Sequence, residues 1–236
     1  MKSVYDYIIV GGGIVGVSTA WQLQQRHPDK SILLVEKESG FAKHQTGHNS
    51  GVIHAGGVYY APGSLKADFC KRGGVERTIS FCAEHDIPVE NCGKLLVATN
   101  EQEVERMNAL YERCHVNGID VKLLDEVQLK LAEPNITGLG AIYVKTTSIV
   151  DYRLVTEQMA EEFKKLGGQI SLRTKVVAAE EKDEEVQLTC ISDGQTMQLN
   201  TKFLVTCSGL MADRMTKMMG IPTDFQIILI VVNTTA

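Results

Sequence analysis

No block of lysine or arginine interrupts this sequence of 236 residues, and its 29 acidic side chains outnumber the 24 basic ones. Proteins that bind nucleic acid or an anionic membrane surface usually carry a basic patch or stripe. The formal net charge of -5 therefore argues against both classes of partner. A small-molecule ligand is the better expectation.

Closely spaced cysteines are also missing. The six cysteines lie far apart and form no C-x-x-C pair: Cys70, Cys82, Cys92, Cys114, Cys190 and Cys207. This spacing predicts neither a zinc site nor a redox dithiol. We expect reduced thiols, as in a cytoplasmic protein.

Long apolar runs are scarce as well. The run "IILIVV" (227–232) is far too short to span a bilayer. The first apolar run passes directly into a glycine turn, which is not the pattern of a signal peptide. The sequence therefore predicts a cytoplasmic chain without a transmembrane segment.

The first forty residues have the pattern of a βαβ unit. The short run "YDYIIV" (5–10) predicts a strand, three glycines follow it, and the apolar spacing from Ile14 onward predicts a helix packed on a sheet. The run "SILLVEKE" (31–38) predicts a second, buried strand. Such units form parallel sheets with right-handed crossovers.

The rest of the chain predicts helices at about 63–85, 101–118 and 151–168, and strands at 93–100 and 140–145. Four further strands are expected at "QISL", "KVVAAEE", "EVQLTCI" and "TKFLVTC". We expect an α/β fold: a Rossmann-like domain with a parallel sheet, plus an incomplete, inserted β-rich α+β domain. The first would comprise residues 1–88 and 146–220, and the second 89–145 and 221–236.

A glycine motif marks the junction between the first strand and the first helix. Gly11, Gly13 and Gly16 form G-x-G-x-x-G, which permits a tight turn, a close approach of pyrophosphate and close packing of helix on strand. Glu36 follows Gly16 by 20 positions, at the end of the second strand, where a carboxylate can bond ribose hydroxyls. This combination predicts a dinucleotide site, with FAD and NAD both open and NADP the least favoured.

The loop after the second strand is polar and rich in glycine. Thr46, Asn49 and Ser50 offer hydroxyl and amide groups, and Gly47 and Gly51 expose backbone N–H groups. Ligands of open α/β sheets bind at the carboxyl ends of the strands. The loop is therefore expected to run along a cofactor, although a mobile polar loop is the plainer alternative.

Several motifs together resemble one known family. The run "HQTGHNSGVIHAG" with "YYAPGSLKA" after it, and then "CGKLLVA", "SIVDYRLV" and "LVTCSGLMADRM", are similar to the L-2-hydroxyglutarate dehydrogenase/oxidase family, within the D-amino-acid oxidase superfamily. The resemblance implies FAD as cofactor and hydride transfer from L-2-hydroxyglutarate to the flavin, giving 2-oxoglutarate. It also implies oxygen or a membrane quinone as electron acceptor, and a cytoplasmic or peripheral inner-membrane location.

The resemblance also implies the residues that contact the cofactor. Thr46, Asn49, Ser50 and Val52 would lie along the pyrophosphate and flavin, the backbone of Val176 would meet the adenine, and Cys207 to Gly209 would form a second glycine site. The full set is Gly11, Gly13, Ile14, Val15, Gly16, Glu36, Lys37, Gln45, Thr46, Asn49, Ser50, Val52, Val176, Cys207, Ser208 and Gly209.

The histidines of the loop do not have the spacing of a metal cage, and no acidic cluster accompanies them, so no metal is expected. His54 is the candidate catalytic residue, a neutral imidazole that orients a hydroxy acid or moves its proton. A hydrogen-bonded structural histidine is an equal alternative. Tyr59 and Tyr60 are expected to pack, and Cys207 to be a small buried residue and not a nucleophile.

The likeness ends at about residue 226, and "ILIVVNTTA" replaces the expected continuation, so we expect a C-terminally truncated chain. Two alternatives stay open beside the leading function. One is an enzyme of the same superfamily that acts on an amino acid or glycerol 3-phosphate. The other is a non-catalytic flavin-binding fragment.

Overall fold

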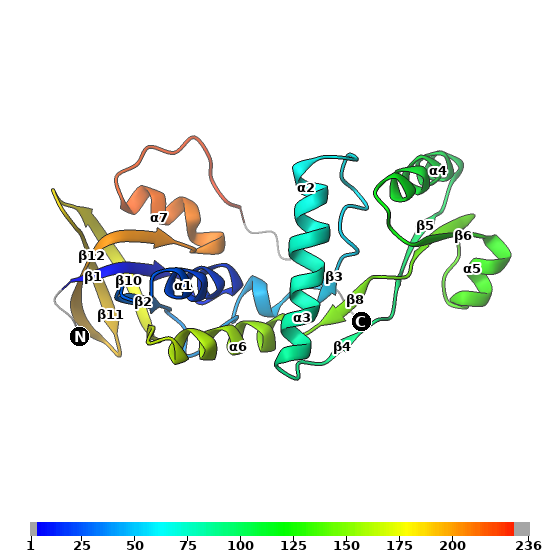
Figure 1. Cartoon of the computed structure of the whole chain (residues 1–236). Coiled ribbons are helices and arrows are strands. Elements are labelled where there is room, and N and C mark those ends of the chain that lie inside the picture. The colour runs from blue at the N-terminus through cyan, green and yellow to red at the C-terminus, as the bar shows by residue number, and fades with distance from the viewer. Residues whose placement is uncertain (1–3, 229–236) are drawn as a thin grey trace. The chain divides into compact units, whose positions relative to one another are not determined.

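The computed structural model describes residues 4–228, which fold as two compact units. The first unit comprises Met1–Asn49 and Tyr152–Ala236, and the second comprises Ser50–Asp151 (Figure 1). Residues 50–88, which the sequence analysis grouped with the dinucleotide-binding domain, lie in the second compact unit. Most of the C-terminal run, residues 229–236, is outside the described residues.

The first unit is built on a six-stranded mixed sheet in the order β10-β11-β12-β1-β2-β9. Its strands are β1 (Tyr5–Val10), β2 (Ile32–Val35), β9 (Gln169–Ser171), β10 (Thr174–Glu181), β11 (Val186–Ser192) and β12 (Gln195–Thr206). β12, β1, β2 and β9 run parallel, as predicted, whereas β10, β11 and β12 are antiparallel. Thr201 joins the two parts, because it pairs with both Tyr5 and Val186.

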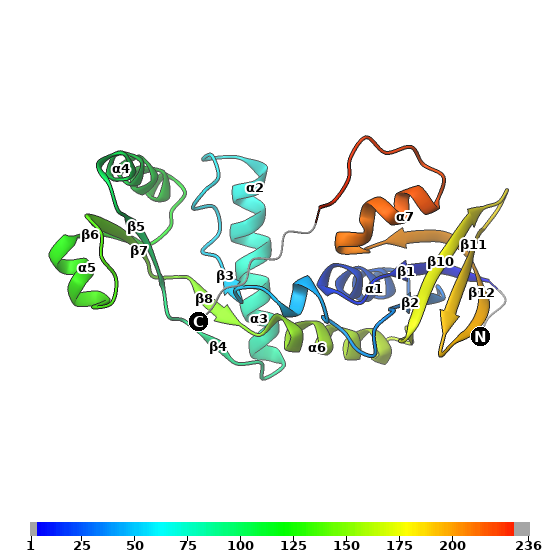
Figure 2. The ribbon, with the colours of Figure 1, turned by 180° about the vertical axis from the view of Figure 1, so that it is seen from behind.

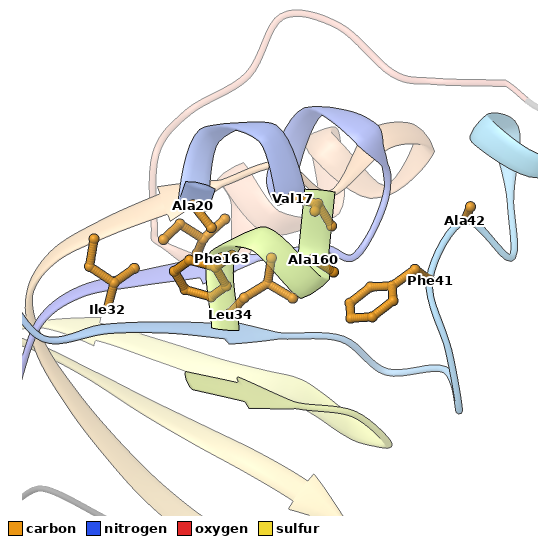
Figure 3. Packing of buried hydrophobic residues seen from close by; sticks show 9 residues of the cluster. Val17, Ala20, Ile32, Leu34, Phe41, Ala42, Ala160 and Phe163 are labelled. Atoms are coloured by element: carbon orange, nitrogen blue, oxygen red, sulfur yellow. The ribbon is translucent and has the colours of Figure 1, made fainter. Parts of the chain in front are cut away.

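Both faces of the parallel strands are covered. Helices α1 (Ile14–Arg26) and α6 (Tyr152–Lys165) pack on one face, where Figure 3 shows Ala20 and Phe163 clustered with Ile32 and Leu34. The alternate residues Leu33 and Val35 pack with side chains of β11 and β12. All four residues of β2 are buried, which explains its continuous apolar run.

The second unit contains a three-stranded antiparallel sheet with a helix on each face. The sheet is formed by β5 (Lys94–Ala98), β7 (Gly140–Val144) and β6 (Val121–Asp125). α4 (Glu101–Val116) packs against Ile142 and Val144, and α5 (Glu126–Ala132) packs against Ala141. In Figure 2, which views the molecule from behind, α4 and α5 lie on opposite sides of these strands.

A second small sheet brings together the first and last segments of this unit. Its strands are β3 (Val52–Ile53), β8 (Ser148–Val150) and β4 (Val89–Glu90). The predicted helix at 63–85 is present, but in three parts: α2 (Leu65–Asp68), the π-helical turn η2 (Phe69–Val75) and α3 (Glu76–Glu84). The Ser64 hydroxyl caps the start by accepting from the Ala67 N–H at 3.3 Å. After β12, the short turn η3 (Gly209–Met211) leads into α7 (Ala212–Met218).

Candidate cofactor site

The glycine turn is fitted tightly between two strand ends. Gly11 has φ of +120°, its N–H donates to the Val35 carbonyl at 2.9 Å, and a Cβ there would overlap the Cys207 carbonyl oxygen. A Cβ on Gly16 would overlap the Gly11 carbonyl oxygen. Both positions therefore require glycine, and the turn brings the backbone of β1 against that of β12.

The N-terminus of α1 is open to an anion. Gly13 is its N-cap and supplies no side chain, and the Ile14 N–H donates to Thr46 Oγ1 at 3.1 Å. Within residues 4–228, no protein group accepts a hydrogen bond from the N–H groups of Gly13, Val15 or Gly16. Free N–H groups at a helix start, together with the helix dipole, favour a phosphate.

Glu36 connects the end of β2 to the glycine turn. Its side chain is only 8% exposed. One carboxylate oxygen accepts from the Gly12 N–H at 2.5 Å, and the other accepts from the Glu38 N–H at 2.8 Å. The Glu36 N–H donates to the Ser171 carbonyl of β9, and the Glu36 carbonyl accepts from the Thr174 N–H at the start of β10. The carboxylate is thus held rigidly beside the turn.

Lys37 is directed elsewhere. Its ammonium lies 2.6 Å from the Glu38 carboxylate and 2.9 Å from His44 Nε2, in an exposed trio. The hydrogen bond from Lys37, followed by the one from His44, lowers the pKa of Glu38. In this arrangement the Lys37 side chain bonds Glu38 and His44, and not the glycine turn.

The first half of the polar loop is docked on the turn. The Ala42 N–H donates to the Gly12 carbonyl at 3.0 Å, and Thr46 lies in the 3-10 turn η1 (Gln45–Gly47) with its hydroxyl on α1. The Asn49 amide donates to the carbonyls of Gln45 (3.2 Å) and Thr46 (2.6 Å). This part of the loop is ordered by its own polar side chains, as a cofactor cradle requires.

The second strand end contributes Cys207, Ser208 and Gly209. The Cys207 N–H donates to the Val10 carbonyl at 2.8 Å, so this segment lies directly beside Gly11. The Ser208 hydroxyl is buried and has no hydrogen-bond partner among the described residues. Burial raises the pKa of the Cys207 thiol, against a smaller opposing effect of Thr19. A protonated, partly buried thiol is suited to packing and not to nucleophilic attack.

The structure therefore groups most of the predicted cofactor residues within the first unit, around the glycine turn. Val176 also lies in this unit, where it is partly buried against side chains of β11 and β12, next to a bulge in β10. Ser50, Val52 and His54 belong to the second unit. Among residues 4–228, no three His, Cys, Asp or Glu side chains gather as metal ligands.

His54 has neighbours that the sequence analysis did not single out. Partial burial, and then the charge of Lys94, lower the pKa of the His54 imidazole. Lys94 Nζ also donates to the Tyr59 hydroxyl at 2.7 Å. Lys94 stands in the quoted run "CGKLLVA", but nothing in a single sequence signals that a strand-opening lysine lies near a loop histidine 40 positions earlier.

Replacing Glu36 by alanine is expected to lower the stability of the first unit by about 2–4 kcal/mol, because two backbone N–H groups lose a charged acceptor. FAD binding is expected to weaken by about 1–3 kcal/mol from loss of the same carboxylate. Urea unfolding followed by the fluorescence of Trp21, the single tryptophan, which lies in α1, measures the first effect. Flavin titration measures the second.

Glu38→Ala is the matched control for this prediction. Within the described part of the chain, the Glu38 carboxylate bonds only surface groups, Lys37 and His44, and exposed pairs of this kind contribute at most about 1 kcal/mol. Equal effects of the two substitutions on stability and on FAD affinity would refute the role assigned to Glu36.

Comparisons with known proteins agree with this site. Residues 6–234 match the family model DAO, FAD dependent oxidoreductase. An L-2-hydroxyglutarate dehydrogenase from Escherichia coli is 51% identical over 222 residues, which cover 94% of this chain and 51% of that protein. The mitochondrial L-2-hydroxyglutarate dehydrogenase of Caenorhabditis briggsae is 43% identical over 227 residues, 95% of this chain and 52% of its own. The chain thus spans about half the length of the curated relatives it matches.

Solved structures share the fold. An L-alpha-glycerophosphate oxidase from Mycoplasma pneumoniae with FAD bound superposes with a TM-score of 0.76 at 23% identity, covering 93% of this chain and 58% of its own. Glycine oxidase from Geobacillus kaustophilus superposes with a TM-score of 0.78 at 19% identity, covering 93% of this chain and 59% of its own.

No helix within residues 4–228 combines the length and apolar character needed to cross a bilayer. The family model extends from the first strand through the glycine turn, both units and the second strand end. By this match over residues 6–234, the chain belongs to the DAO family of FAD-dependent oxidoreductases.

Proposed function

We propose that this chain binds FAD and forms part of an enzyme that oxidises L-2-hydroxyglutarate to 2-oxoglutarate. The observation that carries the cofactor assignment is the meeting of two strand ends at Gly11. Backbone atoms there pack too closely for any side chain, the N–H groups of Gly13, Val15 and Gly16 have no acceptor within the described residues, and the buried Ser208 hydroxyl has no partner. Such groups fit the phosphates and polar edge of a dinucleotide.

The residues proposed to hold FAD are those that the family resemblance indicates. Gly11, Gly13 and Gly16 would face the pyrophosphate, and Glu36 the ribose of the adenosine. Thr46, Asn49, Ser50 and Val52 would continue along the pyrophosphate towards the flavin. The backbone of Val176 would meet the adenine, and Cys207, Ser208 and Gly209 would line the second strand end. Ile14, Val15 and Gln45 complete the proposed set, to which Lys37 would contribute only its backbone.

Bound flavin supplies the hydride acceptor for the oxidation of a hydroxy acid. The residue proposed to act on the substrate is His54. An imidazole whose pKa is lowered stays neutral at physiological pH and can accept the proton of the C2 hydroxyl. As that O–H bond and the C2–H bond break, the C=O bond of the 2-oxo acid forms, and the two electrons leave C2 with the hydride.

The substrate assignment is supported by the similarity to L-2-hydroxyglutarate dehydrogenases at 51% and 43% identity. We expect the whole enzyme of which this chain forms part, loaded with FAD, to reduce an artificial dye with L-2-hydroxyglutarate at least about tenfold faster than with the D-enantiomer, since one correctly placed polar contact discriminates by at least this factor. Glycine and glycerol 3-phosphate serve as competing substrates, and oxygen and a soluble quinone as competing acceptors. A preference for glycine, glycerol 3-phosphate or the D-enantiomer would overturn the substrate assignment.

A further inference from the structure

Lys94, in the second unit, is a cation without an acidic partner among the described residues. It opens β5, and its ammonium donates to the Tyr59 hydroxyl at 2.7 Å. No described carboxylate lies within ion-pairing distance of it. The nearby Lys145, by contrast, pairs with Asp120 at 2.9 Å. The charge of Lys94 is therefore available to an external anion.

The partner of Lys94 is held in place by a fixed loop. The Asn117 amide, at the end of α4, donates to the carbonyls of Gly57 (2.8 Å) and Tyr60 (3.1 Å). The Tyr60 N–H closes a turn on the Gly57 carbonyl, and Val58 is buried against α4 and its sheet. Tyr59, between them, is 52% exposed and presents its hydroxyl beside Lys94.

The backbone of Lys94 is equally restrained. Lys94 pairs with Val144 of β7, and the preceding Gly93 donates its N–H to the Thr147 carbonyl at 3.0 Å. Gly93 has φ of +70° and packs against the Tyr143 ring, where a side chain has no room. An ammonium and a phenol hydroxyl are thus set in advance, without the need to order them on binding.

We propose that Lys94 and Tyr59 bind a carboxylate group of the substrate, with His54 at the adjoining hydroxyl. The Tyr59 oxygen accepts from Lys94, which leaves the phenol proton free to donate, and the ammonium keeps two further donors. A carboxylate offers two oxygens, one for each donor group, and charge-assisted bonds of this kind are the strong ones. The charge of Lys94 also lowers the pKa of the His54 imidazole, so the hydroxyl of the bound 2-hydroxy acid is assigned to the His54 side of the pair.

The role of this site as a substrate site rests on the proposed oxidation of a 2-hydroxy acid. The binding test does not require that oxidation to occur. Glutarate, a dicarboxylate that lacks the hydroxyl and cannot be oxidised at C2, is titrated into the 236-residue chain while the imidazole signals of His54 are followed by NMR. Glutaramide, the uncharged analogue, is the ligand control. We expect saturable His54 shifts with glutarate and none with glutaramide.

Lys94→Gln is expected to weaken glutarate binding about 10- to 100-fold, the effect of losing a charged hydrogen bond, and Tyr59→Phe about 2- to 10-fold. Lys94→Arg keeps the charge and should retain most of the affinity. Lys122→Gln is the matched control, because it removes an exposed lysine from β6 of the same sheet and should leave binding unchanged.

The outcomes separate the two proposals. Glutarate affinity that is equal in wild type, Lys94→Gln and Lys122→Gln, or the absence of any glutarate response in the wild type, would overturn the carboxylate site. Binding that depends on Lys94 in a protein that does not oxidise L-2-hydroxyglutarate would support the site and reject the proposed function. Oxidation with a KM that Lys94→Gln does not raise would do the reverse.

Discussion

Replacing Gly16 by alanine is expected to abolish FAD binding and to destabilise the first unit by about 3 kcal/mol, the upper end of the usual cost of overpacking. The added methyl group would overlap the Gly11 carbonyl oxygen, which is backbone and is itself fixed between β2 and β12. Close-packed backbone atoms cannot move aside by a change of rotamer, as the end of a flexible side chain can. The overlap must therefore displace the glycine turn from the position that a pyrophosphate requires.

Gly40→Ala provides the control for this substitution, because its methyl group would meet only the flexible end of Lys43, at 3.2 Å. Its unfolding free energy should stay within about 0.5 kcal/mol of the wild type, as for most surface changes. Both variants are measured by urea unfolding with Trp21 fluorescence and by flavin titration. A Gly16→Ala protein that binds FAD like Gly40→Ala would contradict the close packing described for the turn.

In the whole enzyme of which this chain forms part, replacing His54 by alanine is expected to lower turnover of L-2-hydroxyglutarate by about 100-fold or more, the usual contribution of a general base, with FAD still bound. The pH dependence gives an independent readout. Burial and the Lys94 charge lower the pKa of His54, so its neutral form persists below pH 6.5 and activity should fall only at lower pH. Lys94→Gln removes one of these two causes and should move this acid limb to higher pH.

His48→Ala is the control, since the His48 imidazole bonds the His44 carbonyl within the exposed start of the same loop. Unchanged turnover in His54→Ala, or an acid limb that survives the substitution, would make His54 a structural histidine. The sequence alone favours the structural and the catalytic interpretations of His54 equally.

The βαβ unit was predictable because its signals are local. β1, α1 and β2 lie within the residues expected from apolar spacing, and the glycine motif falls between the first two. The capping box formed by Asp125 and Gln128 at the start of α5 is also a local signal, although the helix was not predicted from it.

Other features depend on contacts between distant segments. β3, β4 and β8 have only two or three residues each, too few for a periodic pattern, and exist because residues 52–53 and 89–90 meet 148–150. The antiparallel part of the main sheet follows from the pairing of β12, which pairs with β11 up to Thr201 and with β1 from Thr201 onward. The π-helical turn interrupts a predicted helix at Gly73 and Gly74, whose low helix propensity permits it.

The same distinction applies to the site. Gly11, Gly16 and Glu36 were predictable from spacing, but the two N–H groups that Glu36 holds are visible only in the fold. Thr46 was predicted as a cofactor contact, and its bond to the Ile14 N–H adds a role in fixing the loop to α1. Lys94 could not be predicted, since only the turn held by Asn117 brings Tyr59 beside it.

The central claim, that the glycine turn of this chain is a flavin-nucleotide site, is tested most directly by equilibrium titration of the 236-residue protein with FAD and, separately, with NAD. Trp21 in α1 and the flavin itself both report binding. The account predicts one FAD per chain, no comparable binding of NAD, and loss of the FAD signal in Gly16→Ala but not in Gly40→Ala. Tight binding of NAD without affinity for FAD, or FAD binding that is unchanged in Gly16→Ala, would contradict it.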